Sequence, residues 1–174
     1  GYGGSCFPKD TRALVTTSKQ FKTNLSILKS VINSNKSRHK ILLNKINKIM
    51  KNKLKGKNIT FLGVTFKPGT DDMREAASLK LIPYLINKGS NVSYYEPTGL
   101  KVDFNNNKVK YINNIKEACK NANLIIIHTE WNEFKQLNLK KISNKKNYKI
   151  YDLRNLYSPY KMKKNKINYF SIGR

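Results

Sequence analysis

Short apolar runs separated by helical patterns constrain the fold of this chain more than any other feature. NITFLGVTF and NLIIIH are rich in β-branched residues and too continuously apolar for strands with one face in water. Strands that alternate with helices indicate an α/β fold with a parallel sheet covered on both faces. The predicted strands are 58–66, 91–97, 123–128, 148–153 and 167–173, and the predicted helices between them are 74–89, 113–122 and 130–137.

The stretch from Thr11 to about Lys53 is predicted to be one long helix. It contains no Gly or Pro, and its apolar residues recur at spacings of three and four. The polar run NSNKSRHK at 33–40 interrupts this stripe without a breaker residue. Such a helix, apolar on one side and lysine-rich on the other, must pack on a larger body. We expect it to connect domains or subunits.

Composition limits the classes of function. The 174 residues suit one domain with an appended element, and 35 Lys+Arg against 10 Asp+Glu give a net charge of +25. Lys, Asn and Ile are enriched together along the whole chain while Arg is scarce. This pattern indicates a general bias over solvated positions, so we expect no dedicated nucleic-acid site. The positive field should still attract small molecules that carry phosphate.

The cysteines and the apolar runs indicate the cellular setting. Cys6 and Cys119 are far apart and neither has metal-ligand spacing, so we expect neither a disulfide framework nor a bound metal. The apolar runs are far shorter than the roughly 18–20 residues of a membrane span, and no signal-peptide pattern is present. We therefore expect a reduced, cytoplasmic protein without membrane contact.

The segment FKPGTDDMRE at 66–75 follows the first predicted strand and leads into a helix. Ligands bind beyond the carboxyl ends of parallel strands, and helix N-termini favour anions. The segment has no G-x-G-x-x-G pattern, so it supports a phosphate-bearing ligand only in general terms. The alternative is an ordinary loop in which Asp71 or Asp72 caps the helix. Arg154 occupies an equivalent place after a later strand, with a surface arginine as the alternative.

The two histidines and Cys119 are expected to be structural. His128 ends an apolar strand, where a hydrogen-bonded side chain is more common than a catalyst. His39 lies on a lysine-rich helix face and is expected to be exposed, whereas Cys119 is expected in the core.

Cys6 is a candidate nucleophile. Glycines at 1, 3 and 4 permit unusual backbone geometry and close approach of a ligand. A helix that begins near Lys9–Thr11 would place its positive end by the sulfur, and Lys9 adds a cation; both effects lower the pKa of a thiol. Asp10 could act as a base for water at the same site. The alternative is a structural loop cysteine.

The motifs GYGGSCFPKD, FLGVTFKPGTDDMREAAS, YYEP, HTEWNEF and SIGR occur in an order and spacing that resemble the C-terminal portion of the UDP-glucose 6-dehydrogenase family. The resemblance covers essentially the whole chain, and TEWNEF favours the UDP-glucose branch. Two positions depart from the family pattern: Glu96, where Asp is usual, and His128.

The resemblance implies a four-electron oxidation of UDP-glucose to UDP-glucuronate with two NAD+. Cys6 would form a thiohemiacetal and then a thioester, and Asp10 would assist the water steps. The residues that match substrate contacts are Gly1, Tyr2, Gly3, Phe66, Lys67 and Arg154. The residues that match NAD contacts are Lys9 and Arg74.

The resemblance also implies a domain plan. Residues 1–10 would form the active-site cysteine loop, 11–53 a central helical region with a homodimer interface, and 57–174 a Rossmann-like UDP-binding domain. An NAD-binding domain would precede Gly1 in the family, so we expect this chain alone to be inactive. Two alternatives stay open: a dehydrogenase of another nucleotide sugar, and a non-catalytic module that binds nucleotide sugars.

Overall fold

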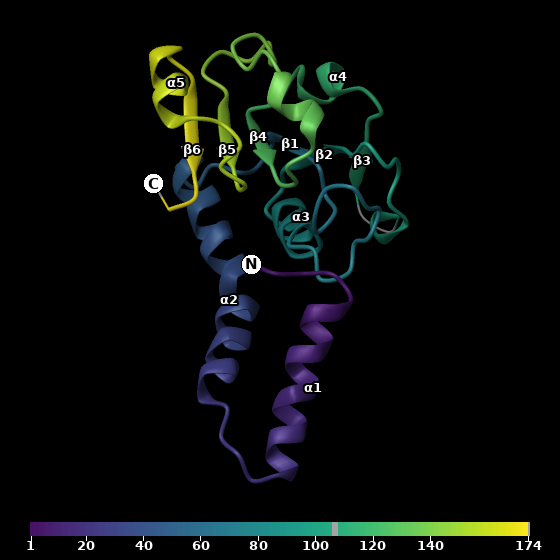
Figure 1. Ribbon diagram of the computed structural model, residues 1–174. Coiled ribbons are helices and arrows are strands. Elements are labelled where there is room, and N and C mark those ends of the chain that lie inside the picture. The colour runs from purple at the N-terminus through teal and green to yellow at the C-terminus, as the bar shows by residue number, and fades with distance from the viewer. Residues whose placement is uncertain (106–107, 174) are drawn as a thin grey trace.

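The computed structural model describes residues 1–105 and 108–173. Within them a six-stranded sheet has the order β3-β2-β1-β4-β5-β6, and every neighbouring pair is parallel (Figure 1). This confirms the predicted α/β fold. The strands are β1 (Asn58–Leu62), β2 (Asn91–Tyr95), β3 (Val109–Tyr111), β4 (Leu124–Ile127), β5 (Lys149–Asp152) and β6 (Asn168–Ser171).

The strand order places a switch point between β1 and β4. The chain moves outward from β1 to β2 and β3, then returns to the other side of β1 to form β4. Leu62 at the end of β1 pairs with Ile127 at the end of β4. Ligands of open parallel sheets bind in the crevice outside the carboxyl ends of such strands. A ligand site is therefore expected at the segments that follow β1, β4 and β5.

Helices cover both faces of the sheet. The second half of α2 and all of α3 pack on one face, and α4, η2 and α5 contribute to the core on the other. No helix within the described ranges combines the length and the apolarity that a membrane span requires. The helices are α1 (Cys6–Gln20), α2 (Ser26–Ile49), α3 (Ser78–Asn87), α4 (Ile115–Cys119) and α5 (Pro159–Lys164), with 3-10 turns η1 (Val102–Phe104) and η2 (Asn132–Gln136).

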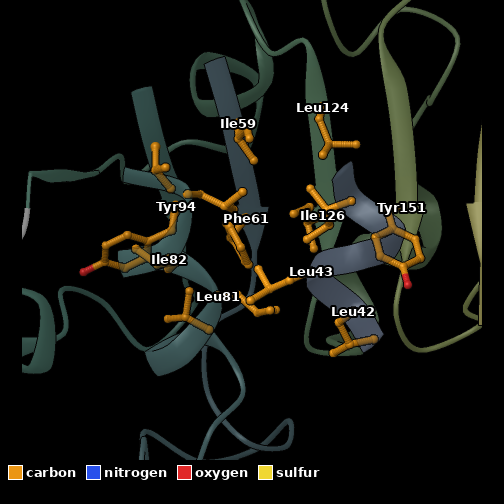
Figure 2. Packing of buried hydrophobic residues seen from close by; sticks show 14 of the residues in the cluster. Leu42, Leu43, Ile59, Phe61, Leu81, Ile82, Tyr94, Leu124, Ile126 and Tyr151 are labelled. Carbon is orange, nitrogen blue, oxygen red and sulfur yellow. The ribbon is translucent and has the colours of Figure 1, made fainter. Parts of the chain in front are cut away.

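The end of α2 is part of the core. Leu42 and Leu43 point toward the strands and lie in the same buried cluster as Phe61, Ile126 and Tyr151 (Figure 2). All four residues of β4 are buried, which explains its continuous apolar sequence. Burial of this apolar area fixes the position of α2 relative to the sheet.

The first helical region is a hairpin, so the prediction of one long helix was wrong. α1 ends at Gln20, α2 starts at Ser26, and the two lie side by side below the sheet (Figure 1). Lys22 has a left-handed backbone (φ 53°), and the N–H of Thr23 donates to the carbonyl of Ser18 at 2.8 Å. This closure of the last helical turn usually uses glycine, which the sequence lacks here.

The helix predicted at 74–89 begins only at Ser78. Glu75 has a left-handed backbone (φ 56°), which a helix does not tolerate. Neither Asp71 nor Asp72 caps α3: the Asp72 carboxylate instead accepts from the backbone N–H of Arg74 at 2.8 Å. The C-terminal end agrees with the prediction, because Gly89 follows it with φ 80°.

Candidate functional site

The glycine-rich start of the chain packs directly on the loop that follows β1. The N–H of Gly4 donates to the carbonyl of Arg74 at 2.7 Å. A Cβ atom on Gly3 would lie 2.8 Å from the carbonyl oxygen of Glu75, and one on Gly4 (φ 81°) would lie 2.7 Å from the ring of Phe66. Only glycine permits this approach, so the two sequence motifs form one structural unit.

Cys6 is the first residue of α1, three residues earlier than the helix start predicted near Lys9. Its thiol is exposed and lies 3.5 Å from the hydroxyl of Ser5. The hydrogen bond from Arg74 to Asp72 is the main cause that raises the pKa of the Arg74 guanidinium, and the charge of Cys6 adds to it. Arg74 therefore lies within electrostatic range of the sulfur.

The two predicted cofactor residues, Lys9 and Arg74, have exposed side chains. Lys9 forms an ion pair with Asp10 at 3.2 Å, with both side chains mostly exposed. Arg74 forms an ion pair with Asp72 at 2.8 Å. Both cations can turn toward a phosphate group with little loss of packing. In residues 1–105 and 108–173, no three His, Cys, Asp or Glu side chains lie close enough together to hold a metal ion.

A cavity of about 850 Å³ lies between the helical hairpin and the sheet domain. It brings together five of the six predicted substrate residues. The sixth, Lys67, lies outside its lining, with Nζ 5.4 Å from the centre of the Phe66 ring. Cys6 and Asp10 are also outside it. The predicted substrate residues that line the cavity are Gly1, Tyr2, Gly3, Phe66 and Arg154.

Arg154 is half-buried and held by Glu130. Its Nη2 donates to Oε1 of Glu130 at 2.7 Å, and its Nε donates to Oε2. Burial opposes ionisation of Glu130, but these hydrogen bonds and the charge of Arg154 outweigh it and lower the pKa. The buried Asp152 shapes the turn that carries Arg154, because it accepts from the N–H groups of Arg154 and Tyr157 at 2.9 and 3.1 Å. Arg154 is therefore not an ordinary surface arginine.

His128 is buried and structural, as predicted. Its Nε2 accepts from the N–H of Ser78 at 3.1 Å, at the start of α3. The Thr129 hydroxyl donates to the carbonyl of Thr65 at 2.7 Å, so it must accept from Nδ1 of His128, 3.1 Å away. Burial, assisted by the charge of Arg154, lowers the pKa of His128 to about 3. The imidazole is thus neutral. It accepts a hydrogen bond from an N–H at the start of α3, the helix end at which the sequence predicted an anion.

Glu96, the second departure from the family pattern, ties the ends of β1 and β2 together. Its buried Oε2 accepts from the N–H groups of Val64 and Thr65 at 2.7 and 3.3 Å. Its Oε1 accepts from the hydroxyl of Thr98 at 3.3 Å. The carboxylate therefore fixes the backbone immediately before Phe66.

α2 contributes cavity residues that the sequence did not predict. Asn35 accepts from the N–H of Tyr2 at 2.9 Å and donates to its carbonyl at 3.0 Å. Arg38 and His39 line the cavity from the same helix, so His39 is half-buried and the prediction of an exposed side chain was wrong. In the sequence these residues belong to a uniform polar run, and no local signal separates them from solvated positions.

Two family models match this chain. The UDP binding domain of the UDP-glucose/GDP-mannose dehydrogenase family matches residues 60–159, and the central domain of that family matches residues 1–37. A crystal structure of an NDP-N-acetyl-D-galactosaminuronic acid dehydrogenase from Methanosarcina mazei Go1 has a TM-score of 0.85 and 25% identity, covering 100% of this chain and 38% of that one.

Curated relatives are more similar in sequence. A UDP-glucose 6-dehydrogenase of Rickettsia prowazekii (strain Madrid E) is 42% identical over 177 residues, and one of Rhizobium meliloti (strain 1021) is 36% identical over 181 residues. These alignments cover 99% and 100% of this chain but 41% and 40% of the relatives, so the chain spans about two fifths of their length. The match to the UDP binding domain alone includes more than half of the residues. The chain belongs to the UDP-glucose/GDP-mannose dehydrogenase family.

Proposed function

We propose that this chain supplies the catalytic cysteine and the UDP-binding surface of a UDP-glucose 6-dehydrogenase, which oxidises UDP-glucose to UDP-glucuronate. The observation that carries the proposal is the packing of the Cys6 segment on the Phe66–Glu75 loop beside the cavity. The contact supports the proposal because Cys6 follows directly on the Gly1–Gly3 segment, which lines a cavity that also contains Arg38 and Arg154. The names of the curated relatives support the same substrate.

Cys6 performs the covalent chemistry in this proposal. Its thiolate attacks the C6 carbon of the aldehyde formed from the glucose C6 alcohol, and the resulting C–S bond gives a thiohemiacetal. Loss of a hydride from that carbon, for which bound NAD+ would be the acceptor, together with loss of the hydroxyl proton to water, would leave a thioester. Water then attacks the thioester, Asp10 accepts a proton from this water, and the thiolate leaves as the carboxylate forms. Thiolate suits both steps because it adds to carbonyl carbon readily and departs readily.

The cofactor residues are proposed from charge and position. Lys9, three residues after Cys6, and Arg74, within electrostatic range of its sulfur, are exposed cations, which fits the phosphates of NAD+. When bound, NAD+ supplies the hydride acceptance that a four-electron oxidation requires twice. Lys9 and Arg74 would exchange their carboxylate partners for phosphate oxygens.

The substrate residues are proposed to hold the UDP part. Glu130 uses the Nε–Nη2 edge of Arg154, so the donors on Nη1 are free for the ligand. Phe66 offers a ring face, and Lys67 can swing from that ring toward a phosphate. The Gly1–Gly3 segment lines the same cavity.

We further propose a cytoplasmic homodimer that forms through the helical hairpin. Large apolar side chains are exposed along it, including Phe21 at 75% and Ile27 at 81%. Phe7 and Leu14 are exposed seven residues apart on α1, and Phe21 follows seven residues later at the end of that helix. The free thiol of Cys6 suits a reducing compartment. A concentration-independent monomer in sedimentation experiments would contradict the dimer.

Titration calorimetry with UDP tests the function. We expect the chain to bind UDP, and Lys67→Ala or Arg154→Ala to weaken binding, while Lys163→Ala on the distant helix α5 serves as the control. A chain that gives no UDP-dependent heat would contradict the assignment. We expect no NADH from UDP-glucose and NAD+ with this chain alone, since it spans about two fifths of its relatives.

Another nucleotide sugar is the alternative substrate. The Methanosarcina mazei structure is described as an NDP-N-acetyl-D-galactosaminuronic acid dehydrogenase, and its fold covers this whole chain. An assay of the full-length enzyme against a panel of nucleotide sugars would decide, with UDP-glucose expected to give the highest kcat/KM.

A further inference from the structure

One face of α2 forms a wall of the cavity. Asn35 and Arg38 are three residues apart, so their side chains lie on the same side of the helix. Asn35 holds the backbone of Tyr2 through two hydrogen bonds. A Cβ on Gly1 would lie 2.8 Å from Oδ1 of Asn35 and 3.1 Å from Cδ of Arg38. Arg38 is therefore packed against the start of the substrate loop.

Arg38 is a half-buried residue of the cavity wall. None of the carboxylates in the described part of the chain forms an ion pair with it. Gly1 lies within electrostatic range of both Arg38 and Arg154, so the two guanidinium groups act on the same end of the cavity. Positive charge thus accumulates at one end of the cavity.

The other charged residues that line the cavity do not neutralise this positive charge. Arg12 forms an ion pair with Glu75, and Arg154 is held by Glu130. Lys36 and Lys80 line the cavity as well, but both are exposed residues that water can hydrate. Arg38 is only partly hydrated, and a buried charge is costly unless an opposite charge or hydrogen-bond acceptors meet it.

We propose that Arg38 is a binding residue for the diphosphate of the nucleotide sugar, acting from α2 on the same cavity as Arg154. The inference rests on the proposed function and adds a third element to the site. A planar guanidinium can donate to two phosphate oxygens at once, which a lysine cannot match. Asn35 holds the backbone of Tyr2 against α2, beside Arg38.

UDP titrations of four proteins test this role: the unsubstituted chain, Arg38→Met, Arg38→Lys and Lys40→Met. R38M keeps the length of the side chain and removes the charge, and we expect a roughly tenfold larger Kd for UDP. R38K keeps the charge but loses the bidentate geometry, so its Kd should lie between those of the unsubstituted chain and R38M. Lys40 is exposed and does not line the cavity, so K40M should bind as the unsubstituted chain does.

Each outcome separates the possibilities. Equal affinity of R38M and the unsubstituted chain would overturn the role of Arg38 and leave the proposed function intact. Equal losses in R38M and R38K would show that packing and not charge matters, which would also overturn it. No UDP binding by the unsubstituted chain would overturn the proposed function itself. If R38M unfolds, Arg38→Gln removes the same charge and is subject to the same criteria.

Discussion

Protonation of His128 is expected to make the stability of this protein depend on pH. The imidazole is buried, and burial lowers its pKa from 6.5 to about 3 in the folded chain. The unfolded chain binds the proton more strongly between these two values. Stability is therefore fully present above pH 6.5 and is lost as the pH falls toward 3.

The size of the effect follows from the two pKa values. At pH 5 the unfolded state gains about 2 kcal/mol from protonation, and at pH 7 it gains only about 0.2 kcal/mol. We therefore expect the free energy of unfolding to fall by roughly 2 kcal/mol between pH 7 and pH 5. Glu130, whose pKa is held below its usual 4.5, contributes its own loss only at more acidic pH.

Urea unfolding at pH 7, 6 and 5 measures this difference, with the slope of the transition as a check on two-state behaviour. His128→Gln keeps an acceptor for the N–H of Ser78 and a donor for Thr129 but cannot take up a proton in this range. We expect the pH dependence to vanish in H128Q and to persist in His39→Gln, which alters the other histidine. An identical loss of stability in H128Q and the unsubstituted chain would refute the reasoning.

Three more outcomes follow from the geometry. Gly63→Ala should lower the free energy of unfolding by about 2–4 kcal/mol, because its φ is 75° and a Cβ would lie 2.5 Å from the side chain of Thr129. Gly56→Ala is the control: its φ is 69° but a Cβ would meet open space, so the free energy of unfolding should fall by only about 1–2 kcal/mol. Thermal melts measure both. Iodoacetamide should label the exposed Cys6 within the folded chain and leave Cys119 intact by mass spectrometry, since burial raises the pKa of the Cys119 thiol to about 12. Glu96→Gln should destabilise the chain by about 1–3 kcal/mol, because the amide loses a charged acceptor for buried N–H groups, and an unchanged urea midpoint would contradict this.

The sheet was predictable because its strands carry their own signal. β4 is buried on both faces and must be continuously apolar, so its position was evident. All five predicted strands correspond to strands of the structure. The missed strand, β3, has only three residues, Val109–Tyr111, at the edge of the sheet. A half-covered edge strand of that length leaves no clear periodicity. The missed helix α5 is also short, with six residues.

The site was only partly predictable, because contacts between distant segments decide which residues meet. The glycines beside Cys6 indicated a close approach, but not that Phe66 and Glu75 would be the neighbours. His128 departs from the family pattern, yet nothing in the sequence shows that it meets the start of α3. The role of Glu96 likewise depends on the backbone N–H groups of Val64 and Thr65, which follow another strand, β1.

The failure to predict the turn at Lys22 and the failure to predict the cavity residues of α2 have the same cause. In a straight helix, residue 35 would lie roughly 36 Å from residue 11, far from the glycine-rich segment. The hairpin brings α2 back, so Asn35 can hold Tyr2 from 33 positions away in the sequence. In this turn Lys22 has the left-handed backbone conformation that glycine usually adopts, so the residue types did not predict the turn. The apolar residues exposed on α1 and α2 and the polar residues of α2 that line the cavity therefore belong to the same helical hairpin. A partner that packs on the outer face would also fix Asn35 and Arg38, which makes the order of the cavity depend on the dimer proposed here.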